Sequence, residues 1–292
     1  MNWTSYHKPK TLAEALELLK EAKGKGRVIA GGTDILLQIR RREFRPESLV
    51  DITGIEALRG IREEDGWIRI GAGVTHGEIA GSRLIRQNAA ALARGCGEVG
   101  SPQIRHMGTL VGNVVTAQPA ADGAIPLMAL EAEMKVVSQD GERWMALEDA
   151  YQGIGLSGVD ASREIATEIR FRIPGRSSRT GFFRMARRKA LALPVLNGAV
   201  SLSLNPSEDR IEKARIAIGP VAEKPFRSRR AEAFLESSGV SPENLLEACR
   251  IASEEANPRT SIRGSASYRK EMVKVNLLRT LGRILDEIRK AK

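Results

Sequence analysis

The sequence predicts an α+β protein built from two domains, and three observations support this prediction. The chain has 292 residues, of which 42% are hydrophobic, and this is enough to form two ordinary cores. Strand-like and helix-like segments alternate through residues 1–55, whereas residues 56–174 mix helices with antiparallel strand patterns. Three further strand-like runs come before the last helices. We therefore expect a first domain over residues 1–175 and a second over residues 176–292.

The first 55 residues predict a small β-α-β-α-β unit. Thr11-Leu12-Ala13-Glu14 is a Thr-x-x-Glu capping box, which opens a helix. Crossover connections of this kind place the strands parallel, and the ligands of such sheets collect at the carboxyl ends of the strands. The expected strands are residues 4–6, 28–30 and 49–52, and the second helix is residues 35–42.

Two consecutive glycines, Gly31 and Gly32, directly follow the second expected strand. Glycine allows positive φ and close approach of a ligand to the backbone, so successive N–H groups can converge on an anion. Asp34 or Thr33 can cap the helix that follows. The segment predicts a phosphate-binding loop, and the alternative is a tight strand-to-helix turn without a ligand. It comprises Arg27, Val28, Ile29, Ala30, Gly31, Gly32, Thr33 and Asp34.

Residues 67–78 contain a glycine pattern that partly matches a dinucleotide-binding motif. The third glycine of that motif would fall at His76, so we reject the match. Thr75-His76-Gly77-Glu78 is instead a capping box for the next helix.

Antiparallel pairing is predicted on both sides of a linker. Asp140-Gly141 lies between two strand-like runs and is a hairpin signal. Residues 174–178, Pro-Gly-Arg-Ser-Ser, have the composition of a linker between domains. The expected strands are 133–137, 143–145, 164–173, 182–187, 199–204 and 214–218, and the expected helices are 231–237, 242–255 and 267–290.

The formal net charge of +10 raises the question of nucleic-acid binding. Only 4% of the residues are aromatic, so few stacking side chains accompany the arginines, and no zinc-finger, RRM or homeodomain pattern occurs. Solvated faces, an acidic protein partner or an anionic cofactor explain the excess charge as well. The arginine-rich segments are 40–42, 184–189 and 227–230.

The apolar segments and cysteines also limit the possible classes. The sequence has no run of about 18 apolar residues and no basic N-terminal segment followed by an apolar one, so we expect neither a membrane span nor a secretory signal. The expected compartment is the cytoplasm. Cys96 and Cys249 belong to no C-x-x-C or Cys/His cluster, so we expect no metal site and no iron–sulfur cluster on this chain.

The sequence contains no clear pattern of a nucleophile, an acid/base pair or a metal site, and we predict no catalytic residue. His7, His76 and His106 lack metal-ligand spacing, and each is expected to be a surface or hydrogen-bonding residue. The acidic pairs Glu63-Glu64 and Glu254-Glu255 are expected on solvated helix or turn faces. This profile is typical of a protein that holds a cofactor and leaves the chemistry to it.

A second glycine-rich stretch, residues 101–122, contains Gln-Ile-Arg-x-x-Gly-Thr-x-x-Gly-Asn followed by Pro-x-x-Asp. Together with Ala-Gly-Gly-Thr-Asp at residues 30–34, it resembles the FAD-binding subunit, often called the medium subunit, of the xanthine dehydrogenase and carbon monoxide dehydrogenase family of molybdenum hydroxylases. The resemblance runs nearly end to end.

The resemblance implies a two-subdomain FAD-binding domain of the vanillyl-alcohol oxidase type (subdomains 1–55 and 56–174). A C-terminal domain of three-stranded antiparallel sheet plus helices would follow. FAD would be bound noncovalently. The first loop, Arg27 to Asp34, would wrap its pyrophosphate through backbone amides. A second loop would contact the diphosphate and ribityl region. The matched residues are Thr109, Leu110, Val111, Gly112 and Asn113 for that loop, Asp122 for the ribityl chain, and Ile165 and Arg184 for two later flavin contacts.

Two residues depart from the family pattern. Val111 stands where the family usually has glycine, so its Cβ is expected to intrude into the loop. Arg184 stands where a close relative has lysine, which keeps the charge and changes its geometry. We expect the Arg184 charge to stabilise negative charge on the reduced flavin, and the alternative is a position on a solvated strand face.

The resemblance also implies an oxidoreductase subunit with partner chains. Electrons would come from a molybdenum cofactor on a large subunit, through [2Fe-2S] clusters on a small subunit, to FAD and then to NAD or another acceptor. The chain would not act on substrate alone. The alternatives are a self-sufficient flavin oxidase of the same FAD-domain superfamily, which would need acid/base residues of its own, and a basic nucleic-acid-binding module.

Overall fold

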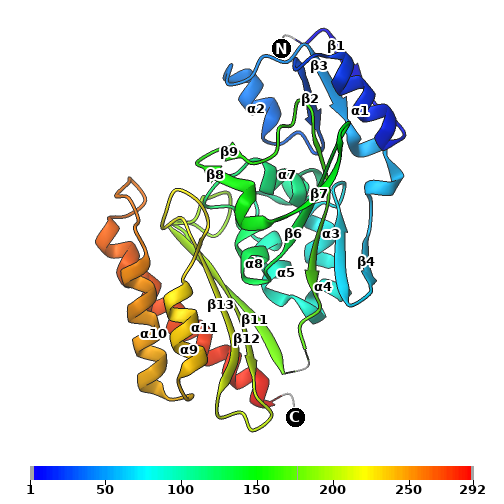
Figure 1. Cartoon of the computed structure of the whole chain (residues 1–292). Coiled ribbons are helices and arrows are strands. Elements are labelled where there is room, and N and C mark those ends of the chain that lie inside the picture. The colour runs from blue at the N-terminus through cyan, green and yellow to red at the C-terminus, as the bar shows by residue number, and fades with distance from the viewer. Residues whose placement is uncertain (1–2, 176, 291–292) are drawn as a thin grey trace.

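The computed structural model describes residues 3–175 and 177–290, so Arg176 in the expected linker lies outside the described residues. Figure 1 shows three parts, which we call the N-terminal unit (residues 3–55), the middle unit (56–175) and the C-terminal unit (177–290). In the described part of the chain, no helix is both long enough and apolar enough to cross a membrane.

The N-terminal unit is the predicted parallel β-α-β-α-β unit, with the strand order β1-β3-β2. Thr11 accepts a hydrogen bond from the Glu14 N–H, as the capping box predicts, but the Glu14 carboxylate accepts from the N–H of Lys10. The second helix ends at Arg40, two residues before the predicted end. The elements are β1 Ser5–His7, α1 Leu12–Glu21, β2 Gly26–Ile29, α2 Ile35–Arg40 and β3 Ser48–Asp51.

The middle unit consists of an antiparallel sheet in the order β4-β5-β10-β6-β7, with short helices packed against it. The predicted hairpin at Asp140-Gly141 and the capping box of Thr75 and Glu78 are both confirmed. The strands are β4 Ile61–Glu64, β5 Trp67–Gly71, β6 Glu133–Ser138, β7 Gly141–Ala146, β8 Tyr151–Gly153, β9 Leu156–Ser157 and β10 Ile165–Arg172. The helices are α3 His76–Gly81, α4 Arg83–Asn88, α5 Ala90–Gly97, α6 Pro102–Met107, α7 Leu110–Val115 and α8 Ala124–Ala129.

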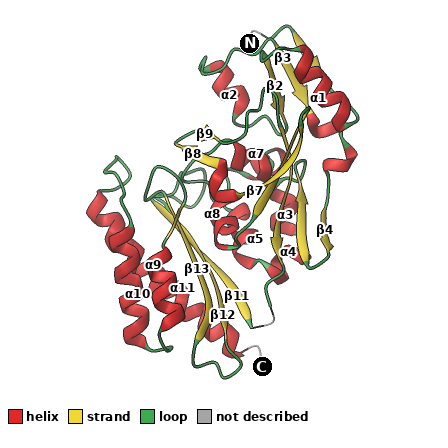
Figure 2. Ribbon diagram, in the orientation of Figure 1, coloured by secondary structure: helices red, strands yellow, loops and turns green. Residues whose placement is uncertain are grey.

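The C-terminal unit has the three predicted long antiparallel strands, and the two-residue strand β14 extends this sheet. Helices α9, α10 and α11 lie on one side of the sheet, and α5 and α8 of the middle unit pack on the other (Figures 1 and 2). The bounds are β11 Ser178–Met185, β12 Leu196–Leu204, β13 Ile211–Gly219, β14 Phe226–Arg227, α9 Arg229–Ser237, α10 Pro242–Glu255 and α11 Ala266–Lys290.

Alternating side chains divide the core between the two faces of that sheet. Phe182, Ala199 and Ala217 lie opposite one another in register and join the hydrophobic cluster of the middle unit. Their neighbour Phe183 points the other way, into the cluster that α11 covers. Because side chains alternate across a strand, one sheet packs against helices of two units. The C-terminal unit is therefore held directly against α5 and α8.

Two predictions about acidic pairs need correction. Glu63 and Glu64 are exposed as predicted, but they lie on strand β4 and not on a helix or turn. Glu255 is not simply solvated, because its carboxylate accepts hydrogen bonds from the Ser228 hydroxyl at 2.5 Å and the Arg230 N–H at 3.2 Å. Glu255 thus links α10 to the start of α9.

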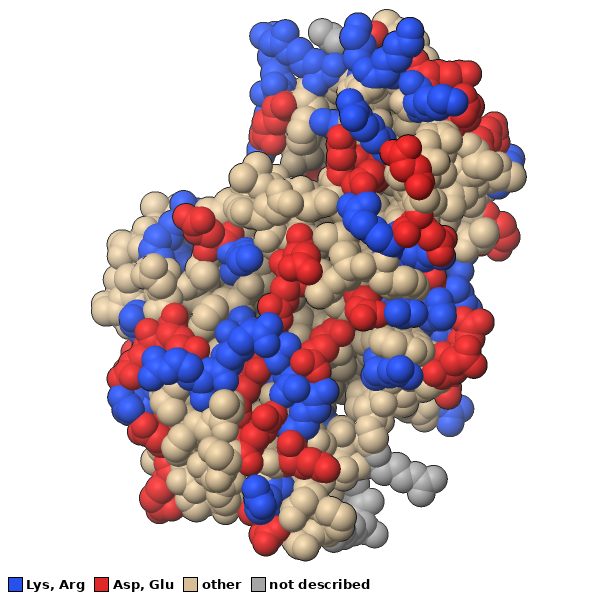
Figure 3. Space-filling model, viewed as in Figure 1, with Lys and Arg blue, Asp and Glu red and all other residues tan. Residues whose placement is uncertain are grey.

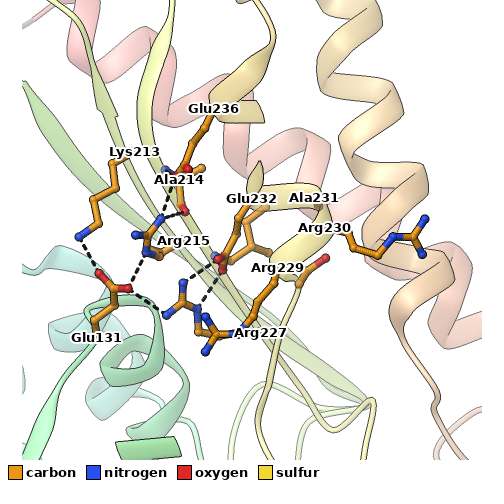
Figure 4. A network of polar contacts seen from close by, with 12 residues as sticks. Glu131, Lys213, Ala214, Arg215, Arg227, Arg229, Arg230, Ala231, Glu232 and Glu236 are labelled. Carbon is orange, nitrogen blue, oxygen red and sulfur yellow. Dashed lines mark hydrogen bonds and ion pairs between the residues drawn. The ribbon is translucent and has the colours of Figure 1, made fainter. Parts of the chain in front are cut away.

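A network of ion pairs crosses the boundary between the middle and C-terminal units (Figure 4). Glu131, which follows α8, pairs with Lys213 at 2.6 Å and with Arg215 at 2.7 Å on β13. Arg227 lies 3.1 Å from Glu131 and 2.6 Å from Glu232 of α9. On the face that Figure 3 shows, basic and acidic side chains are interspersed over most of the surface.

Candidate functional site

The two predicted loops lie directly against each other. A Cβ on Gly31 would lie 1.9 Å from the Met107 carbonyl oxygen and 2.9 Å from the Gly108 Cα. Any side chain at position 31 would therefore collide with the backbone that leads into the second loop. Thr33 also lies against the second loop, since its Oγ1 is 3.2 Å from the position that a Cβ on Gly108 would take. The two loops form one site at the carboxyl end of β2.

The two glycines of the first loop have different roles. Gly32 has a φ of +71°, which confirms that the turn needs positive φ. At Gly31 the missing Cβ makes room for the chain itself, where the sequence had predicted room for a ligand. Asp34 occupies the N-cap of α2 without a side-chain capping bond, so its exposed carboxylate caps no helix N–H group.

The start of the first loop is tied to the middle unit. The N–H of Val28 donates to the Ala161 carbonyl at 3.0 Å. The Arg27 guanidinium pairs with Asp160 at 3.6 Å and lies over the Phe44 ring at 5.1 Å. The Val28 N–H and the Arg27 guanidinium therefore already have partners within the protein. The backbone from Ala30 to Asp34 therefore remains as the part of this loop that can bind an anion.

The second loop begins helix α7. Thr109 is its N-cap, and the Thr109 hydroxyl accepts a hydrogen bond from the Gly112 N–H at 3.1 Å, so its own proton can be donated to a ligand. Leu110 and Val111 are buried in the hydrophobic core. The expected intrusion of the Val111 Cβ into the loop is therefore wrong, because this side chain is only 3% exposed and packs inside the middle unit.

Ile165 does not present its side chain to the surface. It is fully buried at the start of β10, where it pairs with Val137 of β6. Only its backbone could contact a bound molecule.

His76 is the main correction to the sequence analysis, which expected a surface or hydrogen-bonding side chain. Its side chain is buried, with 2% of the residue exposed, and Nδ1 has no hydrogen-bond partner within residues 3–175 and 177–290. Burial and the nearby Arg105 charge lower the pKa of His76 from 6.5 to about 4, so the imidazole is neutral at physiological pH. In contrast, His106 is exposed, as predicted. A lone histidine at the first position of a helix gave no sequence signal of burial.

A buried polar cluster joins Asp122 of the middle unit to two strands of the C-terminal unit. The carboxylate accepts from Arg184 Nε at 2.9 Å and from Asn197 Nδ2 at 2.7 Å. Arg184 also donates to the Ala192 carbonyl. Burial outweighs the Arg184 charge and raises the pKa of Asp122 to about 6. With a side chain only 9% exposed, Arg184 does not lie on a solvated strand face, and that alternative is wrong.

Asn197 was missed by the sequence analysis. It lies on β12, is fully buried and holds both the Ala120 carbonyl and Asp122. A polar residue within the apolar run of residues 195–204 is the signal that could have identified it. The structure thus brings Asp122 and Arg184 together with a residue that no motif marks.

Three buried polar atoms near the second loop and Asp122 lack partners among the described residues, and a ligand could supply them. In the described part of the chain, three buried atoms of this region have no hydrogen-bond partner: His76 Nδ1, Asn113 Oδ1 and Asn197 Oδ1. Such atoms are rare in native proteins, and each one calls for an explanation. They flank the segment that contains Asp122 and Gly123. A polar cofactor that brings hydroxyl and phosphate groups to this site fits the residues present. The described residues contain no group of three His, Cys, Asp or Glu that could hold a metal ion.

Comparisons with known proteins agree with this site. Residues 2–174 match the family model described as the FAD binding domain in molybdopterin dehydrogenase, and residues 181–284 match the CO dehydrogenase flavoprotein C-terminal domain. The chain is 32% identical to the nicotinate dehydrogenase FAD-subunit of Eubacterium barkeri over 96% of this chain and 95% of that one. It is 29% identical to the carbon monoxide dehydrogenase medium chain of Afipia carboxidovorans over 95% of both chains.

Solved structures show the same fold. A carbon monoxide dehydrogenase chain from Hydrogenophaga pseudoflava superposes with a TM-score of 0.91 at 26% identity and covers 97% of both chains. A chain of quinoline 2-oxidoreductase from Pseudomonas putida 86 superposes with a TM-score of 0.89 at 27% identity and covers 99% of both.

Proposed function

The chain belongs to the FAD-binding medium subunits of the molybdenum hydroxylases related to xanthine and carbon monoxide dehydrogenases, and from this we propose that it transfers electrons through FAD between partner subunits and an acceptor. It is an oxidoreductase subunit of the xanthine dehydrogenase family, and its cofactor is FAD. We propose that electrons arrive from [2Fe-2S] clusters and leave to NAD or another acceptor.

One observation carries the assignment of the site. The segment that contains Gly31 and Gly32 and the segment that begins at Met107 are packed in contact, and buried polar atoms without partners lie beside the second segment. A phosphate-bearing cofactor with a polyhydroxyl chain would supply hydrogen-bonding groups for both. We propose that the N–H groups from Gly31 to Asp34 and the Thr109 hydroxyl bind the pyrophosphate.

The remaining residues would orient the cofactor. Asn113 would bind next to Thr109, at the first turn of α7. Asp122, held by Arg184 and Asn197, would accept a hydrogen bond from the ribityl chain through a free lone pair. FAD, when bound, supplies the group that takes up and releases electrons. The protein residues bind it, orient it and exclude water from its buried side.

We propose that substrate oxidation takes place on partner chains. A large subunit would hold the molybdenum cofactor and a small subunit the [2Fe-2S] clusters, and the complex would be cytoplasmic. One cluster of buried hydrophobic residues spans the N-terminal and middle units and takes in three residues of the C-terminal sheet, and a second lies within the C-terminal unit, which supports a division into domains 1–175 and 176–292.

The isolated chain tests this function. Purified without molybdenum or iron, it should be yellow, bind FAD and be bleached by dithionite, but it should not oxidise purines, aldehydes or N-heterocycles. Co-purification with its partner chains should give turnover. If the single chain oxidised such a substrate at an enzymatic rate, the self-sufficient flavin oxidase would be correct. If it bound nucleic acid and no flavin, both flavin hypotheses would fail.

A further inference from the structure

His76 and Asn113 place two unsatisfied polar atoms close to Gly123. A Cβ on Gly123 would lie 3.1 Å from the His76 Cε1, which is bonded to Nδ1, and 3.3 Å from the Asn113 Oδ1. It would also lie 2.8 Å from a methyl group of Leu110, so that side chain would have to shift to admit a residue larger than glycine. The His76 Nδ1 and Asn113 Oδ1 are both buried and have no partner among the residues that the structure describes.

The two atoms can take opposite roles in hydrogen bonds. A neutral imidazole carries one N–H group, which donates, and an amide oxygen accepts. The backbone holds both residues in place, since the His76 N–H donates to the Gly108 carbonyl at 3.0 Å and the Asn113 N–H to the Thr109 carbonyl at 3.0 Å. A hydroxyl group accepts one hydrogen bond and donates another, so a single hydroxyl can satisfy an imidazole N–H and an amide oxygen together.

We propose that His76 and Asn113 bind one hydroxyl group, which accepts from the His76 Nδ1–H and donates to the Asn113 Oδ1. The hydroxyl belongs either to the ribityl chain of FAD or to a buried water molecule. The first source rests on the proposed function, and the second does not. If the hydroxyl belongs to FAD, His76 binds the cofactor directly. If it is a water molecule, His76 is a positioning residue, because it fixes the water that orients the Asn113 amide.

His76→Phe and His76→Asn separate the polar role from the packing role. Phenylalanine keeps a planar ring and removes the N–H, whereas the asparagine amide returns a donor close to the position of Nδ1. His106→Phe is the matched control, since His106 is exposed. Each variant is measured in two ways: thermal unfolding without FAD, and the Kd for FAD and for FAD analogues that lack the 2′-, 3′- or 4′-hydroxyl of the ribityl chain.

If the hydroxyl comes from FAD, His76→Phe should weaken FAD binding about fivefold, which corresponds to one ordinary hydrogen bond. His76→Asn should recover most of this loss. One deoxy analogue should bind the wild type and His76→Phe equally. If the hydroxyl is a water molecule, His76→Phe should lower the unfolding temperature of the FAD-free protein, and the penalty should be the same with every analogue.

The proposal is overturned if His76→Phe binds FAD as tightly as the wild type and is equally or more stable. That result would mean that Nδ1 has no partner, because replacing an unsatisfied buried polar group by an apolar one stabilises a protein. Failure of the proposed function gives a different result, namely that the wild-type chain itself does not bind FAD. The ¹⁵N spectrum of the His76 ring provides an independent check, since the proposal requires the Nδ1–H tautomer.

Discussion

Two polar clusters join the C-terminal unit to the middle unit, and the central carboxylates of the two differ sharply in burial. The inner cluster is Asp122, Arg184 and Asn197, and the side chains of its ion pair are 7% and 9% exposed. The outer cluster, shown in Figure 4, is centred on Glu131, whose side chain is 37% exposed and which contacts Lys213, Arg215 and Arg227. Both clusters connect the same two units. Only the inner one lies at the candidate site.

The difference in burial indicates a different role for each cluster. Transfer of an ion pair from water to the interior costs more than the pair usually returns, so a buried pair is a poor way to hold two domains together. At Glu131 the outer network avoids much of this cost, because water still reaches that carboxylate, whereas its Arg227–Glu232 pair is as buried as the inner one, with side chains 5% and 6% exposed. We infer that the outer network contributes to docking, whereas the inner pair is present because the site needs Asp122 in a fixed orientation.

The largest expected effect comes from breaking the inner pair. Arg184→Met should destabilise the protein by about 3 to 5 kcal/mol at pH 8, because it leaves the buried Asp122 carboxylate without its counter-charge. Urea unfolding of the FAD-free protein measures this. The double variant with Asp122→Asn should recover most of the loss, since it removes the uncompensated charge. An equally large loss in the double variant would contradict the account.

The second effect concerns pH and the buried His76. Its pKa is lowered in the folded protein to about 4, so between pH 6.5 and 4 the unfolded chain binds a proton that the folded chain does not. The His76 contribution to stability should therefore fall as the pH falls through this window, by at most about 1.4 kcal/mol per pH unit.

The Asp122 carboxyl changes stability with pH in the opposite direction. Its pKa is raised to about 6, so its contribution falls as the pH rises from about 4 to 6. Unfolding curves of His76→Phe and Asp122→Asn between pH 4 and 7 should separate the two slopes. Relative to the wild type, His76→Phe should gain stability toward pH 4, and Asp122→Asn should not. Parallel curves for all three proteins would refute both shifts.

Removing a charge from the outer network should change the stability of the protein only slightly. Glu131→Gln should cost about 1 kcal/mol or less, and the cost should shrink in 1 M salt, because the Glu131 carboxylate and its partner Lys213 remain accessible to solvent. Glu17→Gln, which removes an exposed pair with Lys20 on α1, is the control and should cost close to nothing. A Glu131→Gln penalty as large as that of Arg184→Met would show that burial does not distinguish the clusters.

The smallest effect is on the flavin potential. The sequence analysis expected Arg184 to stabilise the negative charge of the reduced flavin, but Asp122 neutralises much of that charge. If Arg184→Met folds at pH 6, we expect a shift of the two-electron potential to more negative values by less than about 20 mV, which corresponds to about 1 kcal/mol. Redox titration with a reference dye measures this shift. A much larger negative shift would mean that Arg184 faces the flavin as a free charge.

Local patterns predicted much of the fold. The capping box at Thr75, the Asp140-Gly141 hairpin and helix α10 all depend on neighbouring residues, and the structure has them as expected. The two-residue strand β14 was not predicted, because it forms only by pairing with Ile218 and Ala217 on β13. A short segment of this kind carries no periodicity of its own.

The site was harder to predict from sequence than the fold. Gly31 and Gly32 were identified from their spacing, but the contact of Gly31 with Met107 joins residues far apart in the chain. The burial of His76 and the role of Asn197 likewise depend on tertiary packing. Motifs found the loops that give backbone groups to the site, whereas the side chains between the loops could be found only from the structure.

The central claim is that the loop of Gly31 and Gly32 binds FAD, and a pair of glycine variants tests it most directly. Gly32 and Gly24 both have positive φ, at +71° and +83°, so valine strains the backbone at either position. Gly24 lies in the turn after α1, away from the second loop, and a Cβ at this position would have no atom within 4 Å. The measurement is the Kd for FAD of both variants, with circular dichroism to confirm folding. We predict that folded Gly24→Val binds FAD like the wild type and that Gly32→Val does not bind it. FAD binding by a folded Gly32→Val with unchanged affinity would contradict the account.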